Sequence, residues 1–252
     1  MPPAYVATRP GSRKICRPRK NELKPHLIKQ WVIPPEYNAQ FVWRMEEILD
    51  LYEEPYDPKR PVVCFDERPC QLLADVRESL ACKPGKPKRV DFEYERRGMA
   101  NVLLAFEPLK GRREMRVTER RRKLEFADMM RYLLDDLYPE VERIRLVVDN
   151  LNTHSPAAFY ESFSAQEARR MSKKIEFVYT PKHGSWLNMV EIELSVLVRQ
   201  CLKRRLPDTR SLEREAGAWC EERNRLGTSV DWRFTTEDAR IKLRKLYPSI
   251  DT

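Results

Sequence analysis

The sequence predicts an α/β domain with a mixed sheet, and three observations indicate this fold class. Several short segments in the middle of the chain are apolar or alternate apolar with polar residues, as strands do. Further along, strand-like segments alternate with longer segments of helical periodicity, a pattern typical of α/β proteins. The 252 residues, 41% apolar and 35% charged, provide enough chain for one large folded domain and an appendage.

A basic arm and one helix precede the predicted sheet. Residues 1–30 contain eight Lys or Arg against a single acid, so +7 of the net charge of +9 lies in this arm. Prolines flank residues 37–53, where apolar side chains recur at intervals of three and four residues. We therefore expect a helix over residues 37–53, followed by a linker.

The predicted sheet begins with a short buried strand over residues 61–65, which is expected to end at Asp66. Strand patterns at residues 90–94, 100–106 and 114–118 then indicate an antiparallel meander. The core domain is therefore expected to start near the first of these strands.

Strands and helices alternate in the second half of the chain. Residues 143–148 form an apolar strand that stops at Asp149, and residues 175–179 form the next strand. The expected helices cover residues 124–138, 155–171, 186–203, 211–226 and 236–246. The chain is accordingly divided into an arm with a linker helix (1–60), a core domain (61–205) and C-terminal helices that pack on it (206–252).

Two acidic residues at strand ends suggest metal chemistry. Asp66 and Asp149 each follow an apolar strand, and neighbouring strand ends can bring two carboxylates together. Adjacent carboxylates repel unless a cation lies between them, and Mg²⁺ is typically held by one or two carboxylates plus phosphate oxygens. Alternatively, such residues merely cap the next turn or helix, and spacing alone favours this alternative.

Three segments of the chain resemble the DDE signatures of the mariner superfamily of transposases: Val63–Glu67, Val147–Asn150 with His154, and Ser185–Glu191. The strongest resemblance is to the bacterial insertion-sequence family numbered 630, and it extends over residues 20–248. The resemblance implies a ribonuclease H-like mixed sheet with flanking helices. It also implies cut-and-paste transposition of an insertion sequence.

The resemblance further implies catalytic residues, cofactors and partners. Asp66, Asp149 and Glu191 would be the catalytic residues and would hold two Mg²⁺ or Mn²⁺ ions, with no small-molecule cofactor. In this family, water cleaves a phosphodiester at the end of the element, and the freed 3′-hydroxyl attacks target DNA. The implied partners are transposon ends, target DNA and a second copy of the chain in a homodimer.

The third acid has two candidates. Glu191 and Glu193 flank the apolar stripe of the expected helix, one on each side, so helical geometry does not choose between them. The mariner-like motif Asn-Pro-Ile-Glu aligns with Asn188–Glu191, where Met189 replaces the proline, so Glu191 is assigned and Glu193 is the runner-up. The second and third acids lie 42 positions apart, longer than usual in the superfamily, which predicts an insertion around residues 162–174.

Four neighbours of these acids are candidates for supporting roles. Asn150 and His154 could orient water or phosphate beside Asp149, although His154 could equally cap a helix or pack in the core. Lys182 and His183 could contact DNA, although a basic surface loop would contain the same residues.

Basic clusters are the other predicted DNA contacts, because a phosphate backbone attracts clustered Lys and Arg. Any single cluster could equally be a solvated surface. The assigned residues are Arg13, Lys14, Arg17, Arg19, Lys20, Arg120, Arg121 and Arg122. Related transposases carry a further helix-turn-helix region before this arm, so we expect a truncated copy or one frame of a split element.

Two other functions remain compatible with the sequence: a catalytically inactive DNA-binding remnant, and a structure-selective nuclease of the same fold. A membrane protein is not expected, because the longest apolar stretches are far below the roughly 18 residues that span a bilayer. The six cysteines form no C-x-x-C pair and no export signal is evident, so we expect reduced thiols in a bacterial cytoplasm, in association with the nucleoid.

Overall fold

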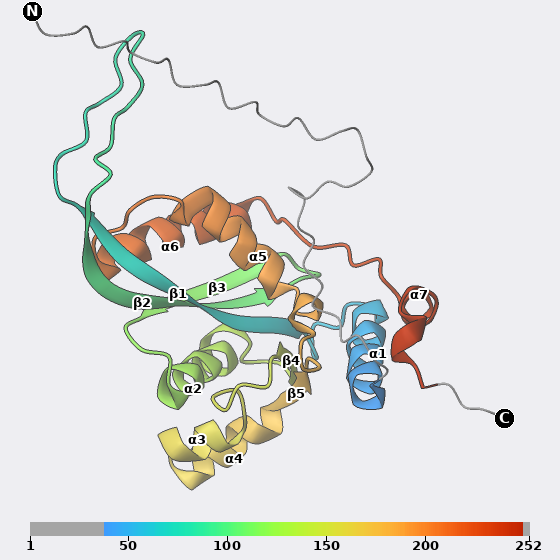
Figure 1. Ribbon diagram of the computed structural model, residues 1–252. Helices are drawn as coiled ribbons and strands as arrows, with labels where there is room; N and C mark the ends of the chain where they lie inside the picture. Colours follow the sequence, from blue (N-terminus) through green and yellow to red (C-terminus); the bar gives the residue numbers. More distant parts are fainter. Residues whose placement is uncertain (1–37, 249–252) are drawn as a thin grey trace, which may run out of the picture. The chain divides into compact units, whose positions relative to one another are not determined.

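The computed structural model describes residues 38–248, so the basic arm with Arg13, Lys14, Arg17, Arg19 and Lys20 lies outside the described residues. Within the described part, five strands form one sheet in the order β3-β2-β1-β4-β5 (Figure 1). The strands are β1 (Val62–Asp75), β2 (Tyr94–Glu107), β3 (Arg112–Thr118), β4 (Ile144–Val148) and β5 (Ile175–Tyr179).

The strand directions define a mixed sheet. β1 pairs antiparallel with β2, and β2 pairs antiparallel with β3. β1 pairs parallel with β4, and β4 pairs parallel with β5. The predicted fold class is therefore confirmed. Because β3, β4 and β5 run in one direction, the segments that follow Thr118, Val148 and Tyr179 lie at one edge of the sheet, which we call the carboxyl edge.

Helices cover both faces of the sheet, and Figure 1 shows α5 and α6 on one side and α2, α3 and α4 on the other. The first layer contains α1 (Ala39–Glu53), α5 (Val190–Leu197) and α6 (Thr209–Arg225), with α7 (Thr236–Lys242) next to α1. The second layer contains α2 (Lys123–Tyr132), α3 (Ala157–Ser162) and α4 (Ala165–Lys174). Short helical segments cover Leu133–Leu137, Ser185–Leu187, Val198–Leu202 and Arg244–Leu246.

Strand alternation separates two hydrophobic cores. Cys64 and Val147 face the layer of α1, α5 and α6, whereas Phe65 and Val148 face the layer of α2, α3 and α4. Full burial of a side chain such as Phe65 contributes roughly 2 kcal/mol of hydrophobic free energy. α1 and α6, which we expected before and after the core domain, contribute side chains to the same core as β1.

Two expectations about the strands were wrong. β1 does not end at Asp66 but continues to Asp75, and Pro69 lies within it. Only the first residues of β1 pair with β4. Further along, β1 has no strand partner on that side within residues 38–248, so Pro69, which has no N–H, is tolerated there. The expected strand at residues 90–94 is absent, since β2 begins at Tyr94. Phe92 is 83% exposed, so the alternation there does not reflect a half-buried face.

The helices largely follow the expected periodicity, with breaks that the sequence pattern did not show. The helix expected at residues 124–138 changes to π geometry at Leu133, and the helix expected at 186–203 changes at Val198. Most of the region where we expected an insertion, residues 162–174, forms α4. Among the described residues, no helix is long and apolar enough to cross a membrane.

Candidate active site

Strand register brings the first two acids together. Cys64 of β1 is level with Val147 of β4, so two residues further along, Asp66 comes level with Asp149. Because side chains alternate along a strand, Asp66 faces the same side as Cys64, the side of α5, whereas Asp149 follows the end of β4 and contacts His154 with one carboxylate oxygen. Asp66 thus reaches the carboxyl edge from within a long strand, whereas Asp149 directly follows the end of a short one.

The third acid is attached to the strand that carries the first. Asn188 is 2% exposed, and its side-chain amide donates to the backbone oxygen of Phe65 at 2.9 Å. The amide of Glu191 in turn donates to the backbone oxygen of Asn188 at 3.0 Å. The first turn of α5, with the exposed Glu191, therefore starts next to Asp66.

The charges of these acids act on one another. Burial raises the pKa of Asp66 to about 7, against the effect of the hydrogen bond that it accepts from the Glu67 amide at 2.7 Å. The negative charges of Asp149 and Glu191 raise this pKa further. Asp149 and Glu191 are therefore each close enough to Asp66 to repel its carboxylate, which is the situation that a bound cation relieves.

His154 holds Asp149 from within the core. Its side chain is 0% exposed, and its ring lies edge-on to Phe65 at 5.4 Å. Nδ1 lies 2.6 Å from Asp149 Oδ1, and Nε2 lies 3.1 Å from Glu67 Oε1. Burial alone would lower the pKa of His154, but the hydrogen bonds to Asp149 and Glu67 outweigh it and raise the pKa to about 9. The ring therefore orients Asp149, and its burial leaves no surface for water or phosphate.

Glu67 is a partner that the sequence pattern did not identify. It is 8% exposed and faces the opposite side of β1 from Asp66, as strand alternation predicts. It belongs to the support of Asp149 through His154. The contact joins positions 87 residues apart, and no local pattern signals such a pairing.

Asn150, Lys182 and His183 lie at the carboxyl edge. The Asn150 side chain donates to the backbone oxygen of Thr180 at 2.5 Å, which ties the segment after β4 to the segment after β5. Lys182 and His183 are exposed, and His183 has a φ of 65°. A Cβ on Gly184 would lie 2.5 Å from Pro181 Cγ, so this tight turn requires glycine there.

A cleft of about 560 Å³ lies beside Asp149. Its walls come from the start of α1 and from the segments after β4 and β5, including Lys182 and His183. Arg44 of α1 also lines the cleft, and its guanidinium lies 4.3 Å from the ring of Trp43. Arg44 was not predicted as a site residue, since the sequence of a helix does not indicate which loop the helix will face.

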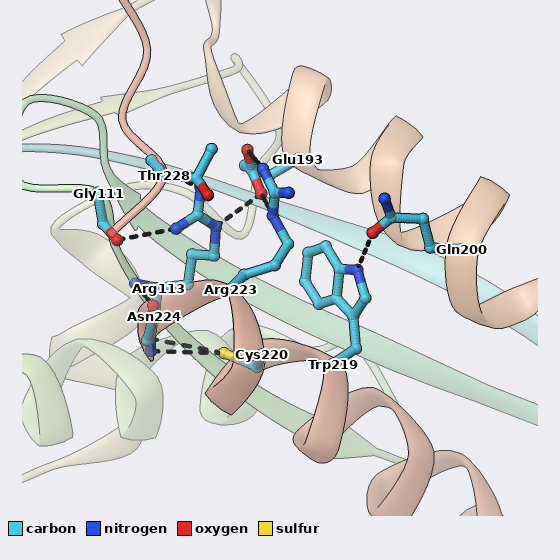
Figure 2. A network of polar contacts seen from close by, with 9 residues as sticks. All are labelled: Gly111, Arg113, Glu193, Gln200, Trp219, Cys220, Arg223, Asn224 and Thr228. Carbon is cyan, nitrogen blue, oxygen red and sulfur yellow. Dashed lines mark hydrogen bonds and ion pairs between the residues drawn. The ribbon is translucent and has the colours of Figure 1, made fainter. Parts of the chain in front are cut away.

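Glu193, the runner-up for the third acid, lies in a different environment. It is 1% exposed, and its carboxylate pairs with Arg113 at 2.6 Å and with Arg223 at 2.8 Å (Figure 2). Burial would raise the pKa of Glu193, but the two guanidinium groups lower it. Both oxygens are thus engaged by cations, which favours Glu191 as the third acid of the site.

Arg120, Arg121 and Arg122 form the turn between β3 and α2, so strand direction places them at the carboxyl edge with Asp149. All three are exposed. The Arg122 guanidinium pairs with Glu125 at 2.7 Å, and the Arg122 backbone N–H donates to the same carboxylate at 2.9 Å, which stabilises the start of α2. The turn is therefore accessible to a ligand that approaches this edge.

The carboxylates at this edge offer oxygen donors of the kind that a divalent cation takes. Within residues 38–248, no three His, Cys, Asp or Glu side chains form a complete metal-binding group. Magnesium usually takes only one or two carboxylates from a protein and completes its shell with water and substrate phosphates. Asp66 and Asp149 each have one carboxylate oxygen without a hydrogen-bond partner among these residues. The carboxylates therefore fit a cation that is also bound by a phosphate.

Comparisons with known proteins agree with this fold. A family model described as DDE superfamily endonuclease matches residues 61–213, more than half of the chain. The structure of the Mos1 mariner paired-end complex with Mn is similar, with a TM-score of 0.52 and 16% identity over 80% of this chain and 62% of that one. A pre-cleavage Mos1 transpososome gives a TM-score of 0.56 and 15% identity over 89% and 68% of the two chains.

At these identities the likeness shows the fold: the five-stranded mixed sheet with flanking helices is the ribonuclease H-like fold of Mos1 transposase. This chain spans 62% of the length of the first of these Mos1 chains. No curated protein is similar enough to count as a relative. The matched residues include all five strands and the segments that carry Asp66, Asp149 and Glu191. The chain belongs to the DDE superfamily of endonucleases.

Proposed function

We propose that this chain is the catalytic part of a DNA transposase that cleaves DNA at the ends of an insertion sequence and joins the ends to target DNA. The observation that carries the proposal is the meeting of Asp66, Asp149 and Glu191 at the carboxyl edge. Burial and mutual repulsion there raise the pKa of Asp66 to about 7. Within the family, the three motifs favour placement with the bacterial insertion sequences numbered 630, which act on DNA in the nucleoid.

The three carboxylates would hold the metal, and their neighbours would orient them and the DNA. Two Mg²⁺ or Mn²⁺ ions, when bound, stabilise the attacking and leaving oxygens of an in-line phosphoryl displacement. Asp66 presents its free oxygen from β1, and His154 fixes the orientation of Asp149. Glu191 approaches from α5, on the same side of the sheet.

DNA would lie along the carboxyl edge. Lys182, His183 and Arg44 line the cleft beside Asp149, where they could bind phosphates near the scissile bond. The turn with Arg120, Arg121 and Arg122 extends the basic surface along the same edge. The similar Mos1 structures are complexes with paired transposon ends, which supports transposon DNA as substrate and a homodimer as the active assembly.

The test is cleavage and strand transfer with labelled duplexes that carry the element's own ends, in Mg²⁺ or Mn²⁺. Wild type is compared with Asp66→Asn and Asp149→Asn, which keep the side-chain shape and remove the charge. We expect metal-dependent nicking and joining that both variants lose. Cleavage without joining would favour a structure-selective nuclease, and DNA binding without cleavage would favour an inactive remnant.

A further inference from the structure

A buried ion network lies beside the proposed site but takes no part in the chemistry above. Arg113 of β3 is 0% exposed, and Glu193 of α5 is 1% exposed. Arg113 Nε donates to Glu193 at 2.6 Å, and Arg223 of α6 donates to both carboxylate oxygens at 2.8 Å (Figure 2). Burial of such charges has a desolvation cost that packed apolar side chains would avoid. Stability alone therefore gives no reason for this arrangement.

The partners of Glu193 form a fixed support. The other guanidinium nitrogens of Arg113 donate to the backbone oxygens of Gly111 at 2.8 Å and Thr228 at 2.6 Å. Asn224 of α6 pairs with both the amide and the carbonyl of Arg113, each at 2.8 Å. β3 and α6 are thus fastened to each other, as Figure 2 shows, and Glu193 is held between them.

Glu193 and Glu191 lie on nearly opposite sides of α5. Two helical steps of about 100° place them roughly 200° apart around the axis. The N-cap of α5, Met189, makes no side-chain capping hydrogen bond. Asn188 ties the start of the helix to Phe65, but a contact at one end of a helix does not set its rotation. Contacts on the side of the helix do, and α5 has two kinds: its buried apolar residues and the ion pairs of Glu193.

We propose that Arg113, Glu193 and Arg223 are positioning residues that fix the rotation of α5 about its axis and thereby hold Glu191 toward Asp66. The inference rests on the proposed function, because the rotation matters only if Glu191 binds metal. Interactions that orient metal ligands are typically worth about 10- to 100-fold in metal affinity or activity. A network that merely stabilises the fold would leave metal affinity unchanged.

Arg223→Gln and Arg225→Gln are a matched pair of variants for the test. Both arginines belong to α6 and form two-contact ion pairs with a glutamate, but Arg225 pairs with Glu222 on the surface. The Arg223 side chain is 15% exposed, so its loss is milder than the loss of the fully buried Arg113. The readouts are Mn²⁺ affinity by titration calorimetry and, without metal, hydrogen exchange of the amides in α5.

We expect Arg223→Gln to weaken Mn²⁺ binding about tenfold and to accelerate exchange in the first turn of α5, with neither effect in Arg225→Gln. A lower melting temperature in Arg223→Gln with unchanged Mn²⁺ affinity would overturn the positioning role alone. Glu191→Gln separates the two claims. If it binds Mn²⁺ as wild type does, the proposed function and this inference both fail.

Discussion

Glu191 and Glu193 are separated by one residue on the first turn of α5, yet the fold gives them opposite surroundings. Glu191 is exposed at the carboxyl edge, near the carboxylate of Asp66 and without an ion pair among the described residues. Glu193 is buried and shared by two guanidinium groups. The comparison teaches that an acid whose charge is already compensated can hold its helix in place but cannot bind a metal. An acid left among like charges is available for a metal.

The largest expected effect is on catalysis. Glu191→Gln should reduce DNA cleavage about a thousandfold, since a metal ligand contributes several kcal/mol of charge stabilisation in the transition state. Melting temperature and DNA binding should be retained, because Glu191 supports no other side chain. Single-turnover cleavage at saturating DNA measures the loss, with the exposed Glu213→Gln on α6 as control. Equal losses of cleavage in Glu191→Gln and Glu213→Gln would show that Glu191 is not a catalytic residue.

The next effect is on stability, and it belongs to the other glutamate. Glu193→Gln leaves Arg113 buried without a full counter-charge, so the free energy of unfolding should fall by about 3 kcal/mol. Denaturant unfolding measures this change. Glu222→Gln, which removes the surface partner of Arg225, should shift the midpoint little. A stable Glu193→Gln variant would show that the two guanidinium groups do not need their carboxylate.

Substitutions of His154 can separate its contact with Asp149 from its contact with Glu67. Asn at this position can keep a donor near Asp149, whereas Gln can keep a donor near Glu67 and leaves Asp149 without its contact. We expect His154→Gln to lower Mn²⁺ affinity about tenfold and His154→Asn to lower it less. Calorimetric titration compares them. A larger loss of Mn²⁺ affinity in His154→Asn than in His154→Gln would mean that the contact of His154 with Glu67, and not its contact with Asp149, supports metal binding.

The smallest expected effect separates basic residues by their place in the fold. Arg120→Ala with Arg121→Ala should make DNA binding less dependent on salt. The slope of log K against log salt concentration should become shallower by roughly 0.9 for each phosphate that these arginines neutralise. The control pair, Arg169→Ala with Lys173→Ala, removes exposed bases from α4 on the face away from α5. Binding measured from low to moderate salt should show the change in the first pair only. Equal changes would indicate a diffuse attraction to DNA.

Elements buried along one regular face or on both faces were predicted well. β5 covers the expected residues, and α1 begins within two residues of its expected start, because periodic burial leaves a direct trace in the order of apolar side chains. The end of β1 and the strand expected at 90–94 were mistaken. Their extent depends on which strand lies alongside, and a local pattern does not contain that information.

The sequence by itself determined the fold class and the alternation of elements, and motif resemblance predicted the three acids. Tertiary structure decided how those acids are surrounded. The pairs His154 with Glu67 and Arg113 with Glu193 join positions 87 and 80 residues apart. A short-range pattern records which side of an element is buried, whereas the partner that it meets follows from strand order and helix packing. The motif alignment predicted Glu191 from the sequence, and only the folded chain supplied a physical reason to prefer it over Glu193, whose charge is already paired.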